Sequence, residues 1–344
     1  MPGPQLVDLP PDARILAVRL SALGDIVFAL PVLDALRQAL PQAQIDWLVE
    51  DRHAAVLRDH PDIHEVLEYP RKAWRGGRGM PTLWRHLRGL KKRGRYDLVL
   101  DFQSNLKSAL QMLFLQSPCK VGFRKPIARE GAQRFHHRHA EVAERAHRSA
   151  RDLALLKTLG WDGQPRFDGH WPLPKDVVKS YAEDLAPFTL LHTTTTQYGQ
   201  DKMWPETRWA ALAKDLAAAG KEVQLLWTPA DRPKVEEILQ LCGDAASLAP
   251  ATPSLAHLMA LSDRADRLIG TDSGPVHLAA YRGTPVVALF GPTDPVIYRP
   301  PGEKVAVVYA GEEGQLPPSR DRSRRSPWME RIEVSAVLET ALQS

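Results

Sequence analysis

Short apolar runs alternate with amphipathic helical segments along most of this chain, and the alternation occurs in two sets. The first set covers about residues 14–159 and the second about residues 188–290. Strands that alternate with helices in this way form a parallel sheet whose faces the helices cover. Residues 160–174, between the two sets, are rich in Gly, Pro, Trp and Asp and show no hydrophobic period, which is typical of an interdomain linker. The sequence therefore predicts an α/β protein with two doubly wound domains.

The separate elements are predicted from their hydrophobic periods and from the turn residues that flank them. The expected strands are residues 14–19, 44–49, 63–67, 96–101, 120–123, 188–192, 222–227, 267–269 and 285–290. The expected helices are residues 24–40, 104–115, 147–159, 206–219, 231–241, 253–261, 273–281 and 334–342, with a kink at Pro31 in the first of them. Ligands of such sheets bind at the carboxyl ends of the strands, so a site is expected in the loops that follow strands.

Length, hydropathy and cysteine content narrow the class of protein. The 344 residues exceed the size of one typical core. No apolar run approaches the length of a membrane span, and the first five residues lack the pattern of a signal peptide, so we expect a cytoplasmic protein. Cys119 and Cys242 are the two cysteines, and both lie among apolar or small residues. Neither a disulfide nor a zinc site is expected from them.

Residues 270–280 read Gly-Thr-Asp-Ser-Gly-Pro-Val-His-Leu-Ala-Ala and follow an apolar run. This order predicts a strand, a tight turn and the start of a helix, with Asp272 or Ser273 as its cap and Pro275 in its first turn. Backbone N–H groups and the positive end of the helix dipole then face one point in space. A phosphate group fits at such a point, so the sequence predicts a nucleotide-like ligand.

Other residues of the second half are expected at the same anion. The hydroxyls of residues 193–196, all threonines at a strand end, can donate to phosphate oxygens, and Lys202 can add a point charge. After a further strand, Thr293 and Asp294 can meet sugar hydroxyls. The alternative for each segment alone is a polar surface loop, but together they favour one site.

In the first half, Asp25 follows a strand end and a Ser/Gly-containing loop and stands at the start of a helix. This position predicts a carboxylate at the edge of the sheet, where a general base would face a substrate. The alternative is that Asp25 only caps its helix, which is a common use of Asp.

Positive charge is concentrated in the first half, although the net charge is only +4. Between Tyr69 and Tyr96 there are ten Lys or Arg residues and no acidic residue, and residues 120–151 form a second basic stretch. Such a surface attracts anionic partners, among them a phosphorylated acceptor, an anionic membrane or nucleic acid. Trp74 and Trp84 lie within the first stretch, but no nucleic-acid motif accompanies them. Residues 136–139, His-His-Arg-His, are expected in a flexible basic loop rather than at a metal.

Several motifs are absent from the sequence. No G-x-G-x-x-G follows the first strand, and there is no Walker A loop and no G-x-S-x-G elbow. These absences argue against a dinucleotide dehydrogenase, a P-loop enzyme and a serine hydrolase. No closely paired acidic motif stands at a strand end to hold Mg²⁺, so a diphosphate would be neutralised by Lys202, hydroxyls and a helix terminus.

Four segments in this order resemble glycosyltransferase family 9, the lipopolysaccharide heptosyltransferases. They are residues 21–25 (Ser-Ala-Leu-Gly-Asp) with Leu30-Pro31, residues 201–206 (Asp-Lys-Met-Trp-Pro-Glu), residues 270–277 and residues 291–295 (Gly-Pro-Thr-Asp-Pro). Residues 101–108 resemble the acceptor-side segment D-x-Q-x-x-x-K-S of this family, and Arg129, His147 and Arg151 look most like its type I members.

The resemblance implies a GT-B fold of two Rossmann-like domains facing across a cleft. Residues 1–165 would form the acceptor-binding domain, residues 175–325 the nucleotide-sugar-binding domain, and residues 326–344 a helix that packs back on the first domain. The donor would be ADP-heptose and the acceptor the Kdo sugar of a lipid A inner core. The reaction would be inverting, with no metal and no other cofactor. We also expect peripheral contact with the anionic inner face of the cytoplasmic membrane and no nucleic-acid partner.

The resemblance also implies roles for individual residues. Asp25 would be the catalytic base. The donor-binding residues would be Thr193, Thr194, Thr195, Thr196, Lys202, Asp272, Ser273, Gly274, His277, Thr293 and Asp294. The acceptor-binding residues would be Ser21, Gly24, Arg71, Lys72, Arg75, Gln103, Lys107, Ser108, Arg129, His147 and Arg151. Helix capping is the favoured role of Asp272, because a carboxylate does not attract a diphosphate.

Two departures from the family pattern stand out. Ser104 occupies a position where Gly is usual, and residues 320–328 carry Ser and Arg where many relatives carry cysteines. The first affects acceptor fit, and the second removes a metal or redox role for that loop. A transferase for another nucleotide sugar, a non-catalytic nucleotide-sugar binder and a nucleic-acid-binding protein stay open as alternatives.

Overall fold

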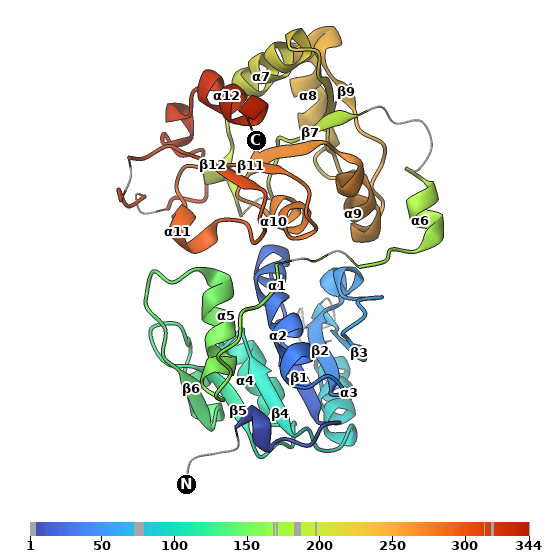
Figure 1. The fold of residues 1–344 in the computed structure, drawn as a ribbon, viewed down its shortest axis with the longest axis vertical. Coiled ribbons are helices and arrows are strands. Elements are labelled where there is room, and N and C mark those ends of the chain that lie inside the picture. Colours follow the sequence, from blue (N-terminus) through green and yellow to red (C-terminus); the bar gives the residue numbers. More distant parts are fainter. Residues whose placement is uncertain are drawn as a thin grey trace. The chain divides into compact units, whose positions relative to one another are not determined.

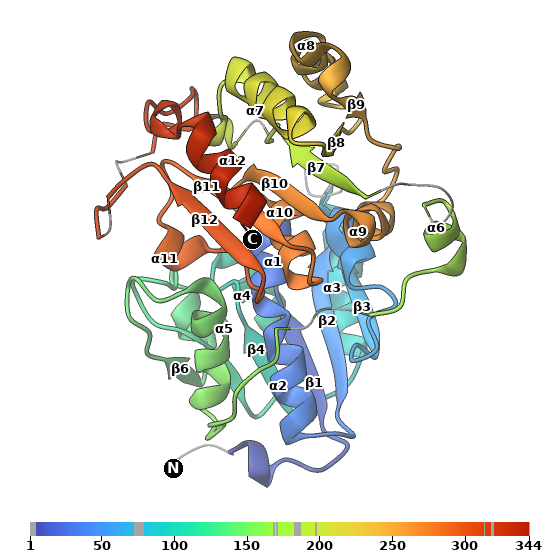
Figure 2. The same cartoon turned by 45° about the horizontal axis from the view of Figure 1, so that its top comes forward.

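The computed structural model describes residues 5–71, 79–167, 169, 171–181, 187–196, 198–312, 314–317 and 320–343. The chain divides into two compact units, which join after Arg166. Each unit is built on a six-stranded sheet whose strand pairs run parallel (Figures 1 and 2). The predicted α/β class with two doubly wound domains is confirmed.

The sheet of the first unit has the order β3-β2-β1-β4-β5-β6. Its strands are β1 (Arg14–Val18), β2 (Gln44–Glu50), β3 (Glu65–Tyr69), β4 (Leu98–Asp101), β5 (Lys120–Phe123) and β6 (Arg138–Ala140). Its helices are α1 (Leu23–Ala29), α2 (Pro31–Ala39), α3 (Met80–Lys92), α4 (Leu106–Met112) and α5 (Arg148–Lys157), with 3-10 turns η1 (Leu6–Asp8), η2 (Asp51–Val56) and η5 (Ala132–Phe135). Val18 lies opposite Asp101, so the loops after β1 and β4 begin side by side at the edge where such sheets bind ligands.

The sheet of the second unit, read from its other edge, has the equivalent order β9-β8-β7-β10-β11-β12. Its strands are β7 (Phe188–His192), β8 (Glu222–Leu225), β9 (Ser247–Leu248), β10 (Arg267–Thr271), β11 (Val286–Phe290) and β12 (Val305–Tyr309). Its helices are α6 (Lys175–Lys179), α7 (Glu206–Ala218), α8 (Arg232–Cys242), α9 (Leu255–Arg264), α10 (Gly274–Tyr281), α11 (Pro295–Tyr298) and α12 (Val334–Gln343), with 3-10 turns η6 (Gln200–Lys202), η7 (Gly243–Ala245) and η8 (Met329–Arg331). His192 lies opposite Gly270, so the loops after β7 and β10 also start together.

The kink expected at Pro31 is confirmed. Helix α1 ends at Ala29, and Pro31 takes the first position of α2. Because proline lacks an N–H and its φ suits a first turn, it starts a new helix here instead of continuing the old one. The short α1 therefore carries its own N-terminus directly after β1.

The stretch at residues 136–139 does not form the flexible basic loop that the sequence suggests. Residues 138–140 are strand β6, and His136 is buried with its Nε2 2.9 Å from Asp101 Oδ2. A Cβ on Gly122 would lie 2.2 Å from the His136 ring, so the glycine leaves the space that the ring occupies. The expectation is wrong because His136 bonds the buried carboxylate of Asp101, which lies 35 residues earlier and cannot be recognised from the local sequence.

The last helix packs within the second unit. Helix α12 contacts α7, β11 and β12, and its Val337 and Ala341 belong to the core that also contains Trp204 and Trp209. The Trp204 indole donates to the carbonyl of Ile332 at 3.0 Å. The expected packing of residues 326–344 on the first domain stays a prediction. None of the helices in the described ranges combines the length and the apolar composition of a bilayer span.

Candidate active site

Helix α10 begins directly after β10, and its N-cap is Ser273. The Ser273 hydroxyl makes no capping bond, and within the described part of the chain its buried Oγ has no hydrogen-bond partner. Pro275 lies in the first turn, where its missing N–H is tolerated. Since the first N–H groups of a helix have no partner inside the helix, this end of α10 can bind an anion.

Asp272, just before this helix, is buried between a lysine and a histidine. The Lys202 Nζ lies 3.1 Å from Asp272 Oδ2 and also donates to the Asp272 carbonyl, and the His277 Nε2 lies 2.8 Å from Asp272 Oδ1. Burial by itself would raise the pKa of Asp272, but Lys202 and His277 together hold that pKa well below its usual range. The capping role favoured for Asp272 is wrong, because its carboxylate is used to hold Lys202 and His277 at the start of α10.

The four threonines after β7 differ in what their hydroxyls do. Thr194 donates to Asp231 Oδ2 at 2.5 Å and so fixes the start of α8. Thr193 is buried, and no described residue bonds its Oγ1. Thr195 donates to the carbonyl of Thr196 at 3.2 Å. Thr193 therefore has an unused buried hydroxyl, whereas Thr194 has a structural one.

The loop after β11 resembles the loop after β10 in its unpaired hydroxyl. Thr293 is buried, and among the described residues nothing pairs with its Oγ1. Asp294 is the N-cap of α11 and accepts the N–H of Val296 at 2.9 Å. Asp294 thus performs helix capping, and a contact with sugar hydroxyls stays a prediction for both residues.

A buried ion pair missed by the sequence reasoning anchors the turn that carries Lys202. Arg320 Nε and Nη2 donate to the two carboxylate oxygens of the fully buried Asp201, at 2.6 and 2.8 Å. The N–H of Ser326 donates to the Asp201 carbonyl at 3.1 Å. Burial opposes the charge on Arg320, but Asp201, and beyond it Asp272, raise the pKa of this guanidinium. The loop around Arg320 therefore brings a cation toward Asp272 and supports the turn that carries Lys202.

In the first unit, Asp25 lies in the first turn of α1 and is held by two arginines. Its Oδ1 is 2.9 Å from Arg19 Nη2 and 2.5 Å from Arg148 Nη2, and its Oδ2 accepts the N–H of Ala22 at 3.4 Å. Burial raises the pKa of Asp25. Arg19, Arg148 and the hydrogen bonds from Arg148 and Ala22 outweigh this effect, so the pKa is lowered from its ordinary value to about 2. The carboxylate caps its helix through the Ala22 N–H, and because its side chain is 30 % exposed, its role as a general base stays a prediction.

A second carboxylate, Asp152 on α5, lies in the same electrostatic environment. It is buried, and within the described chain its Oδ2 has no hydrogen-bond partner. Burial raises its pKa to about 6; Arg19 and Arg148 oppose the rise, and Asp25 adds to it. Asp25 and Asp152 lie near the same two arginines, yet the pKa of Asp25 is lowered and that of Asp152 is raised.

Asp101, at the end of β4, organises the loop that carries several expected acceptor residues. It accepts the N–H groups of Gln103 and Ser104 at 3.0 and 2.9 Å and the Ser108 hydroxyl at 2.8 Å, besides its bond to His136. Ser108 is fully buried and its hydroxyl holds the loop, so its contact with an acceptor stays a prediction.

Gln103 and Ser104 connect this loop to its neighbours. The Gln103 Oε1 accepts the N–H groups of Leu20 and Ser21 at 3.2 and 3.3 Å and so fixes the chain just before Asp25. Ser104 has a φ of +43°, in the left-handed region that favours glycine, which fits the Gly that the family resemblance led us to expect there. Its hydroxyl accepts the Phe123 N–H at 3.2 Å and donates to the Asp101 carbonyl.

A fully buried carboxylate, Glu50 at the end of β2, gathers Arg52, which the sequence reasoning missed, and two basic side chains that it placed at the acceptor, Arg71 and Lys107. Arg52 Nε lies 2.9 Å from Glu50, Arg71 Nε 3.7 Å and Lys107 Nζ 3.8 Å. Burial, Arg52 and Arg71 together lower the pKa of nearby His53 to about 4, so His53 is neutral at pH 7. Three cations around one anion leave a net positive cluster. Lys72 and Arg75 lie outside the described residues.

Comparison of the chain with known proteins identifies its family. The family described as glycosyltransferase family 9 (heptosyltransferase) matches residues 83–329. The chain belongs to glycosyltransferase family 9. Its relatives include the lipopolysaccharide heptosyltransferase 1 of Pseudomonas aeruginosa, 32% identical over 82% of this chain and 79% of the relative, and that of Escherichia coli K12, 28% identical over 88% and 95%.

Solved structures of heptosyltransferases share the fold of this glycosyltransferase. The Escherichia coli heptosyltransferase WaaC with ADP covers 96% of this chain and 99% of its own, with a TM-score of 0.76 and 25% identity. The Escherichia coli ADP-heptose heptosyltransferase II covers 96% and 97%, with a TM-score of 0.77 and 22% identity. The expected GT-B class is confirmed as two Rossmann-like sheets in one chain, and the enzyme is a glycosyltransferase.

The remaining expected acceptor residues of this glycosyltransferase lie around α5 and α4. His147 is the N-cap of α5 and accepts the Ser149 N–H at 3.2 Å, and its ring packs edge-on against Phe28. Arg151 donates from Nε to the Ala146 carbonyl at 3.1 Å, and the Arg129 side chain is exposed. His147 and Arg151 thus shape the loop before Arg148, and their contact with an acceptor stays a prediction. Ser21 and Gly24, partly exposed beside Asp25, stay acceptor candidates in the same way.

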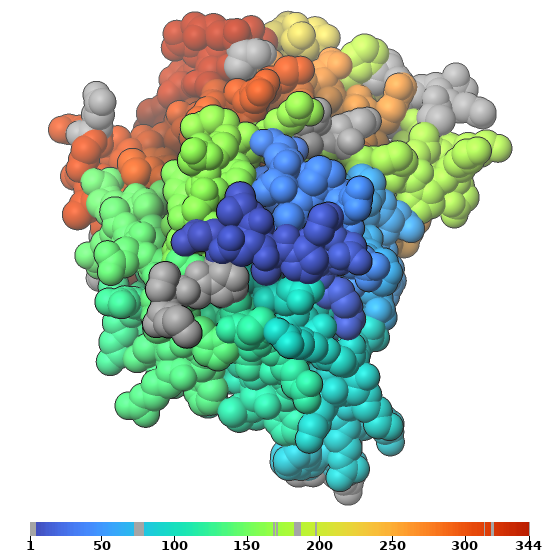
Figure 3. Space-filling view, turned by 60° about the horizontal axis from the view of Figure 1, so that its bottom comes forward, coloured from blue at the N-terminus to red at the C-terminus, as the bar shows by residue number. Residues whose placement is uncertain are grey.

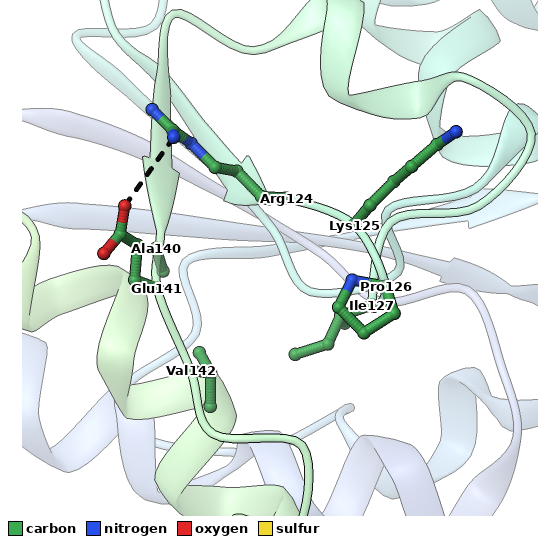
Figure 4. Close-up of a pocket in the computed structure, with 7 residues that line it drawn as sticks. All are labelled: Arg124, Lys125, Pro126, Ile127, Ala140, Glu141 and Val142. Atoms are coloured by element: carbon green, nitrogen blue, oxygen red, sulfur yellow. Dashed lines mark ion pairs between the residues drawn. The ribbon is translucent and has the colours of Figure 1, made fainter.

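A small pocket lies at the carboxyl ends of β5 and β6. Its volume is about 210 Å³, and it is lined by Arg124, Lys125, Pro126, Ile127, Ala140, Glu141 and Val142 (Figure 4). Arg124 points toward Glu141, with Nη1 3.6 Å from Oε1, while Lys125 points away. Because both partners are largely exposed, the pair adds little stability, and the pocket is too small for a whole sugar-lipid.

Proposed function

We propose that this family 9 enzyme transfers a heptose from ADP-heptose to the Kdo sugar of a lipid A inner core, with inversion and without a metal ion. The relatives named above as lipopolysaccharide heptosyltransferase 1, and the Escherichia coli enzyme solved with ADP, support the donor and the acceptor class. The observation that carries the proposal is the Lys202–Asp272–His277 cluster, because it holds a lysine ammonium at the N-terminus of α10, where a diphosphate could bind.

On the donor side, the diphosphate would bind at the first turn of α10. The hydrogen-bond donors available to it are Lys202, the N–H groups near Gly274 and the buried hydroxyls of Thr193 and Thr293. Each charge-assisted hydrogen bond contributes about 1.5–3 kcal/mol. Arg320, drawn toward Asp272 by its pair with Asp201, adds a second cation. These positive groups support metal-free neutralisation of the leaving group.

The chemical step would be a direct displacement. The acceptor oxygen forms a bond to the anomeric carbon while the bond from that carbon to the diphosphate oxygen breaks, and ADP leaves with the electron pair. The acceptor proton passes to Asp25. Since the pKa of Asp25 is about 2, the carboxylate cannot deprotonate a free hydroxyl; it takes the proton only as the new C–O bond makes that hydroxyl acidic. A base of this type contributes roughly 10²–10⁴-fold.

On the acceptor side, the cations around Glu50 would meet the carboxylate of Kdo or a phosphate. Arg71 and Lys107 each lie within 4 Å of Glu50, which holds them while leaving their own donors partly exposed. A lipid-linked acceptor also requires the enzyme to work at a membrane. We therefore propose a cytoplasmic enzyme that binds peripherally to the inner face of the cytoplasmic membrane.

A donor screen tests the proposal. ADP-heptose, ADP-glucose, UDP-sugars and GDP-sugars would each be offered with a Kdo-lipid A acceptor, and products would be identified by mass spectrometry. The expected result is transfer of heptose from ADP-heptose and no detectable transfer from the UDP and GDP donors. Transfer of another sugar would assign a different donor, and ADP-heptose binding without any product would assign a binding protein.

A further inference from the structure

Helix α3 presents an outward side that is both basic and apolar. Leu83, Leu87 and Leu90 face inward and belong to the core of the first unit. Met80, the first residue of the helix, is 49 % exposed although its spacing aligns it with Leu83, and Trp84 on the outward side is 47 % exposed. The charged residues on that side are also exposed; they are Arg85, Arg88, Lys91 and Lys92. Figure 3 shows the segment around α3, in cyan, projecting at the lower edge of the first unit.

The neighbouring helix α4 continues this surface. The Trp84 ring meets Phe114 edge-on at 5.8 Å, and His86 Nε2 lies 2.9 Å from Gln111 Oε1. Both helices turn their buried sides to the same core cluster, so their outward sides face away from the same side of the sheet. Leu106 and Leu113, seven residues apart on α4 and its end, are 57 % and 61 % exposed. We call the surface formed by Met80, Trp84, Arg85, Arg88, Lys91, Lys92, Leu106 and Leu113 the α3–α4 face.

The charges of the α3–α4 face are not neutralised within the protein. Among the residues that the structure describes, none forms an ion pair with Arg85, Arg88, Lys91 or Lys92, whereas the adjacent Arg93 pairs with Glu65. A groove of about 660 Å³ runs along the helix and is lined by Pro81, Trp84, Arg85, Arg88, Gly89 and Lys92. Like charges side by side repel one another, so the face gains free energy when an anionic partner binds.

Exposed apolar side chains concentrate on the same face. Of the five large apolar side chains that are exposed in the described part of the first unit, four are Met80, Trp84, Leu106 and Leu113, and the fifth is Val7. Scattered exposed apolar residues are ordinary, but a cluster beside unpaired cations marks an interaction surface.

We propose that the α3–α4 face docks onto an anionic phospholipid bilayer. Lys and Arg meet lipid phosphates, Trp prefers the interface, and aliphatic side chains enter the outer part of the acyl layer. A nucleic acid would use aromatic stacking, and three of the four apolar side chains here are aliphatic. The proposal rests on the proposed function in one respect, since a lipid-linked acceptor makes a bilayer the expected partner.

Vesicle sedimentation with the full chain tests the face. Wild-type enzyme would sediment with vesicles of phosphatidylglycerol and phosphatidylethanolamine, and not with phosphatidylcholine alone. The double variant Arg88→Gln/Lys92→Gln should bind anionic vesicles about 25-fold more weakly, because each basic residue near the surface contributes about fivefold. Trp84→Ser should weaken binding without changing its salt dependence. The matched controls are Lys214→Gln and Leu241→Ser, both on exposed helix surfaces of the second unit, and they should bind like the wild type.

A second measurement separates this proposal from the proposed function. With a soluble, delipidated acceptor sugar, the face variants should transfer heptose as the wild type does; with the acceptor in anionic vesicles, their rate should fall by the binding factor. Undiminished vesicle binding by the variants, or no vesicle binding by the wild type, would overturn the docking face. RNA binding by the enzyme would be measured as well. If the face variants lost RNA binding but bound vesicles like the wild type, the docking face would also be overturned. Vesicle binding that depends on the face, in an enzyme that transfers no heptose to either acceptor, would retain the face and refute the proposed function.

Discussion

Arg19 and Arg148 determine how Asp25 can act. A carboxylate with a pKa of about 2 is ionised at every physiological pH, and its Oδ1 is committed to two guanidinium groups. The arginines therefore lower its basicity but fix its position. Such an arrangement favours a base that acts late, when the transition state has already made the proton acidic.

Replacing Asp25 by Asn should lower kcat by two or more orders of magnitude, since the amide cannot take a proton. The amide oxygen can still accept the Ala22 N–H, so helix α1 should keep its cap. Steady-state kinetics would give kcat, and calorimetry would show unchanged ADP affinity. The exposed Asp12→Asn is the matched control. Wild-type kcat in Asp25→Asn would reduce Asp25 to a helix cap.

Asp152 should make the protein less stable as the pH rises from about 4 to 6. Its pKa is raised to about 6, so in this range the folded state binds a proton that the unfolded state has lost. Asp25 has the opposite sign, because its lowered pKa adds stability above pH 4 that is lost toward pH 2. Denaturant unfolding of Asp152→Asn should show the pH 4–6 slope removed and up to about 3 kcal/mol gained at pH 7. An unchanged slope would contradict the raised pKa.

Ser104 allows backbone strain and hydrogen bonding to be compared at one residue. Ser104→Gly relieves a positive φ, worth roughly 1 kcal/mol, but removes the acceptor of the buried Phe123 N–H, which costs about 1–3 kcal/mol. A net loss of about 1 kcal/mol in the free energy of unfolding is expected. Ser104→Ala keeps the strain and loses the bonds, so it should be less stable than Ser104→Gly. A stabilised Ser104→Gly would show that strain dominates.

At the scale of elements, the pair Asp201–Arg320 joins the turn η6 to the loop before η8. Removing Arg320 leaves the buried Asp201 without its counter-charge, which costs up to about 3–5 kcal/mol in the free energy of unfolding. In Arg320→Met/Asp201→Asn the second change should recover part of that loss, and a double-mutant cycle in urea measures the coupling. The exposed pair Arg324–Asp321 is the control and should show no measurable coupling, because solvent screens it. Additive effects at Asp201 and Arg320 would refute the anchor.

Element boundaries follow from local sequence where turn residues flank an apolar run on both sides. Strands β5 and β7 have the predicted ends, Lys120–Phe123 and Phe188–His192. Strands β6, β9 and β12 escaped prediction. Strands β6 and β9 have only three and two residues and no apolar run, whereas β12 is an apolar run of five residues that the sequence reasoning missed. The loops after β7 and β10 were expected to share a ligand because parallel strands end at one sheet edge, and Lys202 does contact Asp272.

Ion pairs between residues far apart in the sequence could not be predicted from local sequence pattern. Arg148 and Asp25 are 123 residues apart, and Arg320 and Asp201 are 119 residues apart. Neither charged partner differs in sequence context from an ordinary surface residue. Only the fold brings these two of the many arginines to their partners. Their positions determine the lowered pKa of Asp25 and the support of the turn that carries Lys202.

For the whole molecule, the two units each have a sheet and a core of their own. Residues 167–344 alone should therefore fold and bind ADP, with a Kd within about tenfold of the full chain. Calorimetric titration and a single cooperative urea transition would verify this. The same segment with Lys202→Ala is the control and should lose ADP affinity. Failure of the wild-type segment to fold would show that the second unit depends on the first.

The core of the second unit has a consequence for the order of events during synthesis. Trp204 donates to the carbonyl of Ile332, 128 residues later, and Val337 and Ala341 fill the same interior. A ribosome that has made β7 through β11 has still not supplied the side chains that close this interior. The first unit can mature on the ribosome while the core of the second waits for α12, so the two units become stable at different stages of synthesis.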